Sequence, residues 1–414
     1  MNTLRTILAS LLVAPGFPVL AEPVDTAPVV VTASRLAETQ DETLASVSVI
    51  TREEIERIQP HSVVELLRLQ AGVDVARNGG LGGNTSVFLR GANSDHTLVL
   101  IDGVRVSSAT TGTFAWQHLD PAQIERIEIV RGPRASLYGS DALGGVIQIF
   151  TRRPAGATGR VGLGTHGTVR ADAGFGGGRP AGLRYSGQAS LIDSSGFDAT
   201  QPGTFGHDPD DDGYRDESLN ARIEAPLGET ASLAVQGWHS NGLVEFDQGT
   251  QDTENEQAQL TLEQAPTAFW SQRLSAGYAG DIVITDSPFP SDIRTRRRSA
   301  EWQHDLSFGA GQILTLGVDY HEDEGRNVDL ATGTRVFDRS IESSGAFAGY
   351  RAGFGRYDVQ LAAREDDHSE FGGARTGSLA LGVEAGALRL VASHGTAFKA
   401  PTLNQLFHPG FGGF

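Results

Sequence analysis

The sequence contains no cysteine, so it cannot form disulfide bonds or thiolate metal sites. Basic residues are also scarce, with 33 lysines and arginines against 51 aspartates and glutamates and a formal net charge of −18. A nucleic-acid-binding protein would present a basic face, so nucleic acid is not an expected partner. Beyond the N-terminus no run reaches about 18 consecutive apolar residues, which excludes a bundle of membrane-spanning helices. The strands of a membrane barrel are shorter and alternate in polarity, so that class stays open.

The first 21 residues have the pattern of a secretory signal peptide. Arg5 supplies the positive charge, an apolar stretch follows, and small residues lead up to Ala21. Pro15 and Pro18 interrupt the apolar stretch, which makes a buried helix or a membrane helix the poorer interpretation. We therefore expect export, with cleavage after Ala21.

Residues 41–153 carry mixed helix and strand signals. Thr51 with Glu54, and Ser62 with Glu65, have the spacing of a helix N-cap and its capping box. Short apolar segments such as "TLVLID" and "GVIQIF" surround these two helices and have the composition of strands. The pattern predicts a small α+β domain of ordinary size.

From residue 154 onward the sequence alternates in polarity and contains no convincing helix. In "ILTLGVDY", for example, Leu316, Val318 and Tyr320 fall on one face and Thr315 on the other. We count roughly a dozen such strands, joined alternately by short turns and long acidic loops, as in outer-membrane barrels. A soluble protein of several β-sheets is the alternative interpretation of the same pattern.

Two long segments then resemble the plug domain of TonB-dependent outer-membrane receptors. They are "RGANSDHTLVLIDGVRV" (90–106) and "IERIEIVRGPRASLYGSDALGGVIQIFTRR" (124–153). "PVVVTASR" (28–35) resembles the TonB box of the same family, and "GTAFKAPTLNQLF" (395–407) resembles one of its mid-barrel segments. Within the family, the run "HTLVLIDGVR" followed by "RGPRASLYGSDALGG" resembles the cobalamin-receptor branch more than the ferric-siderophore branch.

The resemblance implies an α+β plug domain followed by an antiparallel transmembrane β-barrel, which closes with about 22 strands in transporters of this kind. The implied parts are a signal peptide (1–21), a periplasmic tail (22–40) with the TonB box (28–35), the plug (41–153) and the N-terminal part of the barrel with its extracellular loops (154–414). The chain stops well short of that strand number, so we expect an incomplete barrel. Because lipid does not tolerate an open sheet edge, the 414-residue chain alone is not expected to form a stable transporter.

The implied function is uptake of vitamin B12 (cobalamin) or a related corrinoid across the outer membrane of a Gram-negative bacterium. The implied partner is TonB, powered by the inner-membrane proton gradient, and the receptor is expected to be a monomer in outer-membrane lipid. A ferric-siderophore or haem receptor is the first alternative, and a non-transporting adhesin or pore is the second. Enzyme activity is not expected, because the sequence has no nucleophile elbow or Walker motif and "GLGTHG" does not open a helix.

The candidate TonB box contains β-branched valines in an N-terminal tail, and such a segment suits addition of a strand to a partner's sheet edge. Its residues are Val29, Val30, Val31, Thr32 and Ala33. Arg90 and Arg131 are candidates for bidentate contacts with barrel carboxylates that would hold the plug. The alternative is that both arginines are solvated.

"VSSATTGTF" (106–114) is the candidate plug apex, because its hydroxyl groups and glycine suit hydrogen bonding to a large polar ligand. Many loops of this composition are only loops. The candidate substrate-binding residues are Ser107, Ser108, Thr111, Thr113, Asn78 and Asn84.

"DPDDDG" (208–213) fits the first half of an EF-hand loop, but Leu219 stands where the twelfth-position glutamate is needed. A second acidic stretch, residues 245–256, lies in the following outer loop. The resemblance implies that calcium, a structural ion in the cobalamin receptors, binds between the two loops. The implied ligands are Asp198, Asp210, Asp212, Asp247 and Asp252, with Phe246 standing where a tyrosine is expected.

Overall fold

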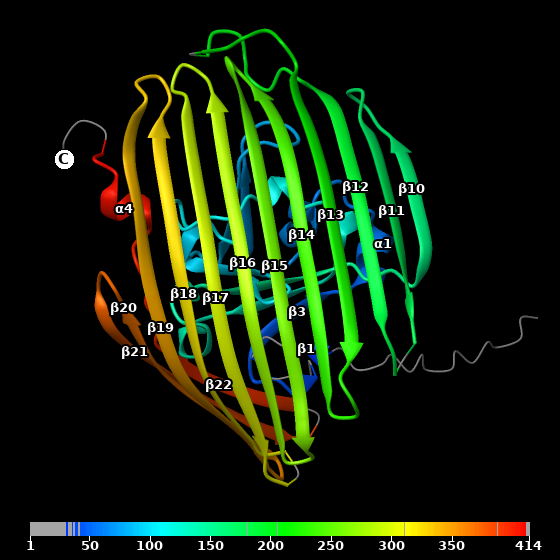
Figure 1. Ribbon diagram of the computed structural model, residues 1–414, viewed down its shortest axis with the longest axis vertical. Helices are drawn as coiled ribbons and strands as arrows, with labels where there is room; N and C mark the ends of the chain where they lie inside the picture. The colour runs from blue at the N-terminus through cyan, green and yellow to red at the C-terminus, as the bar shows by residue number, and fades with distance from the viewer. Residues whose placement is uncertain are drawn as a thin grey trace, which may run out of the picture.

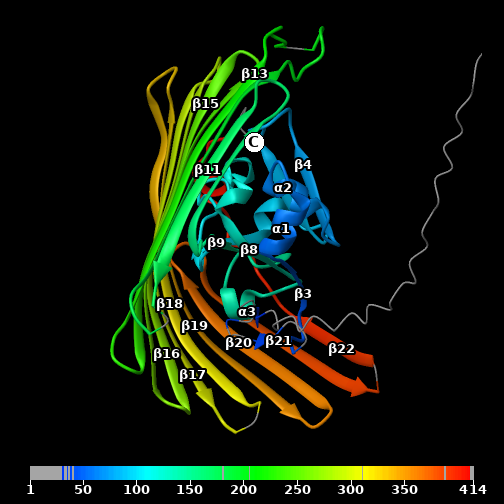
Figure 2. The same ribbon diagram turned by 90° about the vertical axis from the view of Figure 1, so that its right-hand side faces the viewer.

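The computed structural model describes residues 30–31, 35, 38–39, 42–179, 181–204, 206–309, 311–386 and 388–410. They form a mixed α/β domain, here called the plug, and one long curved antiparallel sheet, here called the wall, which wraps around the plug (Figures 1 and 2). Within these residues no helix has both the length and the apolar character that crossing a membrane requires. The expected signal peptide, residues 1–21, lies outside the described residues.

The plug is built on a five-stranded sheet in the order β3-β8-β9-β6-β7. Strand β6 runs parallel to β9, and the other neighbours are antiparallel. A β4–β5 hairpin and three short α-helices lie around this sheet. The elements are β3 (Ser46–Ile50), α1 (Arg52–Ile58), α2 (Val63–Arg68), β4 (Val73–Arg77), β5 (Thr85–Leu89), η1 (Ser94–His96), β6 (Thr97–Ile101), β7 (Val104–Arg105), η2 (Trp116–His118), η3 (Pro121–Gln123), β8 (Ile124–Arg131), α3 (Ala135–Tyr138) and β9 (Gly145–Thr151).

Both helices expected from the sequence begin at their predicted caps. The Thr51 hydroxyl accepts a hydrogen bond from the Glu54 amide at the start of α1. At the start of α2 the Ser62 side chain makes no such bond, and the Glu65 carboxylate instead accepts from the His61 amide. Helix α2 still docks firmly, because its apolar side chains are buried in the main core with the plug sheet.

The wall contains 13 strands in chain order, each antiparallel to the next, which confirms the predicted series of about a dozen strands. Figure 1 shows them as long, tilted neighbours. The strands are β10 (Gly156–Leu163), β11 (Val169–Gly178), β12 (Arg184–Phe197), β13 (Asp212–Pro226), β14 (Ala231–Phe246), β15 (Gly249–Thr267), β16 (Trp270–Asp286), β17 (Ser291–Ser307), β18 (Ile313–Asp329), β19 (Thr334–Phe354), β20 (Tyr357–His368), β21 (Gly372–Ala385) and β22 (Leu388–Gly395).

The predicted alternation separates an apolar outer face of the wall from a polar inner face. On β18, Leu316 and Val318 are 40 % and 52 % exposed, whereas Thr315 is 2 % exposed. The inner face holds the plug through hydrogen bonds: the Gln123 amide donates to the Ser190 hydroxyl, and its oxygen accepts from Asn220. Such a sheet suits lipid outside and a polar lumen inside.

Strands β10 and β22 are the two edges of the wall, and within the described residues they do not pair with each other. After β22 the chain turns into the lumen and lies against the plug, and this stretch includes the short helix α4 (Leu403–Phe407). Figure 2 shows the plug seated in the concave side of the wall.

Candidate functional site

One end of the plug carries the short strand β1 (Val30–Val31), which pairs antiparallel with β2 (Glu38–Thr39). These two valines belong to the candidate TonB box. The other members of that segment lie outside the described residues: Val29, Thr32 and Ala33. A ladder only two residues long holds few backbone hydrogen bonds, so little has to be broken for β1 to change partner.

Arg35 follows this segment and fastens it to the wall. Its side chain is 7 % exposed, forms an ion pair with Glu301 and lies 3.9 Å from an Asp319 oxygen. The guanidinium also stacks over two rings, 4.9 Å from the centre of Tyr138 and 4.4 Å from that of Phe347. Carboxylate and aromatic contacts of this kind stabilise a buried guanidinium.

A cavity of about 650 Å³ separates the plug from the wall next to Arg35. Arg35 and Arg105 line it from the plug side, and Arg273, Glu301 and Asp319 line it from the wall. Because Arg35 forms part of the lining, displacement of its side chain enlarges this cavity.

Paired charges continue along the inner face of the wall. Arg364 contacts both oxygens of Asp319 at 2.6 and 2.8 Å and also binds Asp366 at 2.6 Å. Arg297 binds Asp323 in the same bidentate way, at 2.5 and 2.7 Å. Bidentate pairs of this geometry are strong and directional, so they fix the shape of the lumen.

At the opposite end of the plug, residues 107–113 form the apex loop. Ser108 is buried and its hydroxyl lies 3.1 Å from that of Thr295, so it holds the loop to the wall. Thr111 and Thr113 are more open and bond to each other at 3.0 Å. Of the four apex candidates, Thr111 and Thr113 are therefore the more open, whereas the Ser107 hydroxyl is buried.

The other two candidates, Asn78 and Asn84, face each other across the tip of the β4–β5 hairpin, where the Asn78 amide donates to the Asn84 carbonyl. Both side chains are exposed. The glycines of this tip lie against Ala199 and Tyr214, at the base of the first acidic loop. The hairpin and that loop therefore border the same region.

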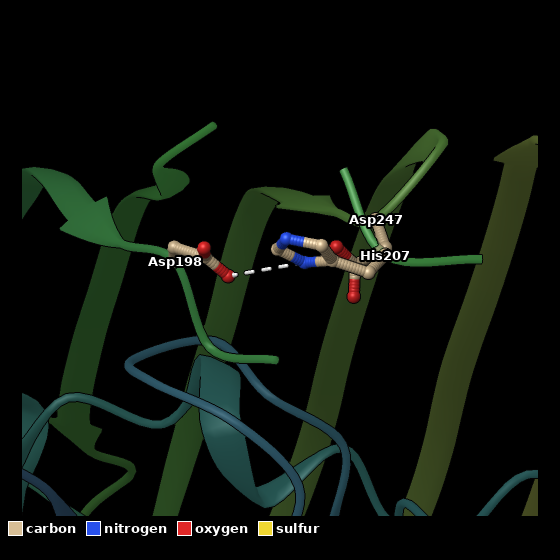
Figure 3. A group of neighbouring side chains, drawn as sticks. All are labelled: Asp198, His207 and Asp247. Carbon is tan, nitrogen blue, oxygen red and sulfur yellow. Dashed lines mark ion pairs between the residues drawn. The ribbon is translucent and has the colours of Figure 1, made fainter. Parts of the chain in front are cut away.

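The two acidic loops bring carboxylates together at the rim. An Asp198 oxygen lies 3.7 Å from Nδ1 of His207, and the Thr200 hydroxyl bonds both His207 and Asp247. Figure 3 shows the imidazole beside the two carboxylates. Ligand atoms of Asp198, His207 and Asp247 lie within 4.8 Å of one another.

A second group shares Asp247 and consists of carboxylates alone. Ligand atoms of Asp210, Asp212 and Asp247 also lie within 4.8 Å of one another. Four of the five predicted metal ligands are thus close together. Asp252 is exposed on β15 and belongs to neither group.

The arginines that contact the wall differ from those expected. Arg131 donates to the Ala71 carbonyl at 2.7 Å, and Arg90 lies beside Gly132, so both stay inside the plug. Among the ion pairs of the described residues, none joins either arginine to a wall carboxylate. The expectation that these two hold the plug is corrected by this placement, because they lie against nearby plug carbonyls and turns.

Comparison with known families agrees with this architecture. Residues 39–146 match the family model described as TonB-dependent Receptor Plug Domain, and residues 158–413 match TonB dependent receptor-like, beta-barrel. The chain belongs to the TonB-dependent receptors. This is a family of outer-membrane proteins, and the predicted fold class is confirmed.

Two relatives are vitamin B12 transporters BtuB, from Photobacterium profundum and Vibrio vulnificus. Each is 31 % identical, over 92 % and 93 % of this chain respectively, and the chain spans 64 % of each relative's length. Among solved structures, a mutant of the ferric enterobactin receptor PfeA from Pseudomonas aeruginosa has a TM-score of 0.76 at 21 % identity, covering 91 % of this chain and 65 % of that one. The siderophore receptor PirA from Acinetobacter baumannii has a TM-score of 0.73 at 20 % identity, covering 87 % and 62 %.

Sequence reasoning misses three residues of this TonB-dependent receptor that the structure brings forward. In the sequence Arg35 is only the last letter of the TonB-box segment, and Arg364 is only a polar position in an alternating strand. His207 stands one residue before the aspartate run. An arginine at an inward position of a strand is a usable signal for a luminal ion pair, but its partner depends on strand register.

Proposed function

We propose that this TonB-dependent receptor takes up cobalamin or a related corrinoid across the outer membrane, driven by TonB and the inner-membrane proton gradient. The 31 % identity to vitamin B12 transporters over 92 % of the chain favours this substrate. The observation that carries the mechanism is that the two ends of the plug carry different features. The apex loop, in which Thr111 and Thr113 are more open than Ser108, lies at the end with the acidic rim, and β1 with Arg35 lies at the other end.

TonB acts in this proposal by pairing with β1. An extended partner segment replaces β2 along the backbone of β1, as in other cases of strand addition. Pulling on β1 then draws Arg35 away from Glu301 and from the rings of Tyr138 and Phe347. The cavity beside Arg35 enlarges, and the substrate gains a path along the inner face of the wall.

Calcium orders the substrate-binding rim in the same proposal. The group of Asp210, Asp212 and Asp247 offers oxygen atoms only, the donor type that calcium prefers, from two different loops. The His207 nitrogen makes the neighbouring group less suited to calcium. Neutralising the carboxylates orders the loops before substrate arrives, so binding loses less conformational entropy.

Calcium binding is expected to depend on Asp247, because that carboxylate belongs to both groups. In calorimetric titration of the purified receptor with calcium, Asp247→Asn should weaken the affinity by about tenfold or more, as expected for losing about 1.4 kcal/mol of ion–carboxylate attraction. The matched control is Asp193→Asn, an exposed aspartate on β12 whose charge change is identical. Equal loss in both variants would show a general charge effect and would count against a calcium site.

Substrate identity is tested with radiolabelled ligands in cells that produce the protein from its own gene. We expect saturable cobalamin binding that weakens when calcium is chelated, followed by uptake that needs TonB. The alternative is a ferric-siderophore receptor, the class to which the similar solved structures belong. Competition of bound cobalamin by a ferric catecholate would favour that alternative. Cobalamin affinity that does not change when calcium is chelated would count against the calcium site.

A further inference from the structure

The segment that follows β22 lies between the wall and the plug and touches the plug at two separate places. We call residues 396–408 the luminal strap. At its lower contact, Nζ of Lys399 lies 2.9 Å from an Asp141 oxygen, and the Ala400 amide donates to the Ser140 hydroxyl at 2.9 Å. Ser140 and Asp141 form the turn that follows α3, so this contact grips the lower part of the plug.

The upper contact of the luminal strap is with the apex loop. The Leu403 amide donates to the Ala109 carbonyl at 3.0 Å, and the Asn404 amide donates to the Thr110 carbonyl at 3.1 Å. Leu403 is fully buried in a small apolar cluster that includes Ala109 and Phe337. The apex loop, the luminal strap and the wall therefore pack together in one apolar cluster.

Helix α4 begins at the upper contact and gives that end of the strap a defined shape. Thr402 caps it, with the full capping box that also uses Gln405. The strap also fits closely under the apex, because a Cβ added to Gly112 would lie 2.9 Å from the Thr402 methyl group. Movement of the strap thus displaces the apex loop.

The lower contact is the Lys399–Asp141 ion pair, which can separate more easily than the bidentate arginine pairs of the lumen. Of the 33 lysines and arginines in the chain, Lys399 is the one lysine. An ammonium group makes point contacts, whereas the guanidinium groups elsewhere in the lumen bind bidentately. Burial alone would raise the pKa of Asp141, but Lys399 and Arg105 hold that pKa below its usual range. The pair is therefore charged at neutral pH and lost when either group moves away.

The same turn lies close to the residue that fastens the TonB-box segment. The Arg35 guanidinium stacks on the ring of Tyr138, the last residue of α3. Arg105 donates to the carbonyls of Tyr138 and Ser140 and lies 3.7 Å from an Asp141 oxygen. Contacts therefore run from Arg35 through the end of α3 to Lys399, and through the strap to the apex loop.

The geometry points to the luminal strap as the coupling element between the two ends of the plug, with Lys399 as the positioning residue that holds the apex loop while Arg35 is seated. When Arg35 leaves its site, the turn after α3 shifts, Lys399 separates from Asp141, and the strap releases the apex loop. Coupling through such a series of contacts needs one element that can adopt two arrangements. In this proposal that element is the Lys399–Asp141 contact, which is either closed or separated. The inference rests on the proposed TonB-driven function, because it assigns a consequence to movement of Arg35.

Peptide mass spectrometry makes the test specific to Lys399. Outer membranes from cells that produce the receptor from its own gene are treated with an N-hydroxysuccinimide ester, and modification of Lys399 is followed by peptide mass spectrometry. The Lys399 side chain is 14 % exposed and ion-paired, so wild-type labelling should be slow. We expect Arg35→Ala to accelerate it about tenfold, equivalent to shifting the closed state by about 1.4 kcal/mol. Arg35→Lys keeps the charge but loses the ring stacking, so labelling of the Lys399 peptide, counted separately from the new lysine at position 35, should fall between the wild-type and Arg35→Ala rates.

The matched control is Arg375→Ala, which removes an exposed arginine from β21 and should leave labelling unchanged. If Arg35→Ala labels Lys399 at the wild-type rate, the coupling role is wrong. In the Asp141→Asn variant, Lys399 should be labelled rapidly with or without Arg35. A further increase in the labelling rate when Asp141→Asn is combined with Arg35→Ala would also contradict the proposed order of events. Cobalamin binding to the same membranes is measured separately. If cobalamin does not bind while the Arg35 effect holds, the substrate assignment fails and the strap inference stands.

Discussion

Replacing Val30 by proline is expected to stop uptake almost completely while leaving cobalamin binding intact. Val30 lies opposite Thr39 in the β1–β2 ladder, and we propose that TonB pairs with this same backbone. Proline lacks the amide hydrogen and fixes the backbone, which removes about 3 kcal/mol from regular structure. A loss of that size lowers the TonB-bound population about 100-fold. Initial uptake rates of radiolabelled cobalamin, normalised to bound cobalamin, measure the effect.

The control for this variant is Val30→Ile, which keeps the amide hydrogen and the β-branched side chain. It should transport at nearly the wild-type rate, because strand addition uses the backbone more than the side chain. If the Val30→Pro variant takes up cobalamin at the normal rate, TonB does not energise the receptor through this segment. That result would favour the alternative of a non-transporting barrel or a diffusion pore.

The wall could be predicted from the sequence because its signal is local. Alternation on β18 and β20 assigns each residue to one face without knowledge of its neighbours, and the structure places Thr315 and Arg364 on the inner face as the pattern requires. The helix starts at Thr51 and Ser62 were predictable for the same reason. The sequence therefore predicted the features that depend only on residues close together in the chain.

The luminal contacts could not be predicted because they depend on register and on which plug residues approach which strand. Arg35 meets Glu301 across 266 positions of sequence, and Lys399 meets Asp141 across 258. The same limit explains why Arg90 and Arg131 were expected at the wall and are found inside the plug. In the acidic loops, the family resemblance implied five ligands, and the structure brings four of them close together, whereas Asp252 lies within β15 and belongs to neither group.

Replacing Arg364 by methionine is expected to destabilise the receptor by about 3–5 kcal/mol, the usual loss when one partner of a buried ion pair is removed. The Arg364 side chain is 1 % exposed and neutralises two carboxylates, Asp319 and Asp366, which are also largely buried. Both carboxylates would remain in the lumen, Asp366 without its ion pair and Asp319 with only the longer, 3.9 Å contact to Arg35. Urea unfolding of the lipid-reconstituted receptor, followed by tryptophan fluorescence, gives the free energy of unfolding.

Arg375 provides the comparison that separates burial from charge. It lies on the neighbouring strand β21, its side chain is 82 % exposed, and it pairs with Glu365 at 2.8 Å. Solvent screens such a pair, so Arg375→Met should cause no measurable loss. Adding Asp319→Asn to Arg364→Met should restore part of the lost stability, because it removes one of the two buried charges that lose their contact with Arg364 and keeps the side-chain shape. If the second substitution instead adds to the loss, the hydrogen bonds that the Asp319 carboxylate accepts contribute more to stability than its buried charge costs. The luminal carboxylates would then stabilise the wall as hydrogen-bond acceptors.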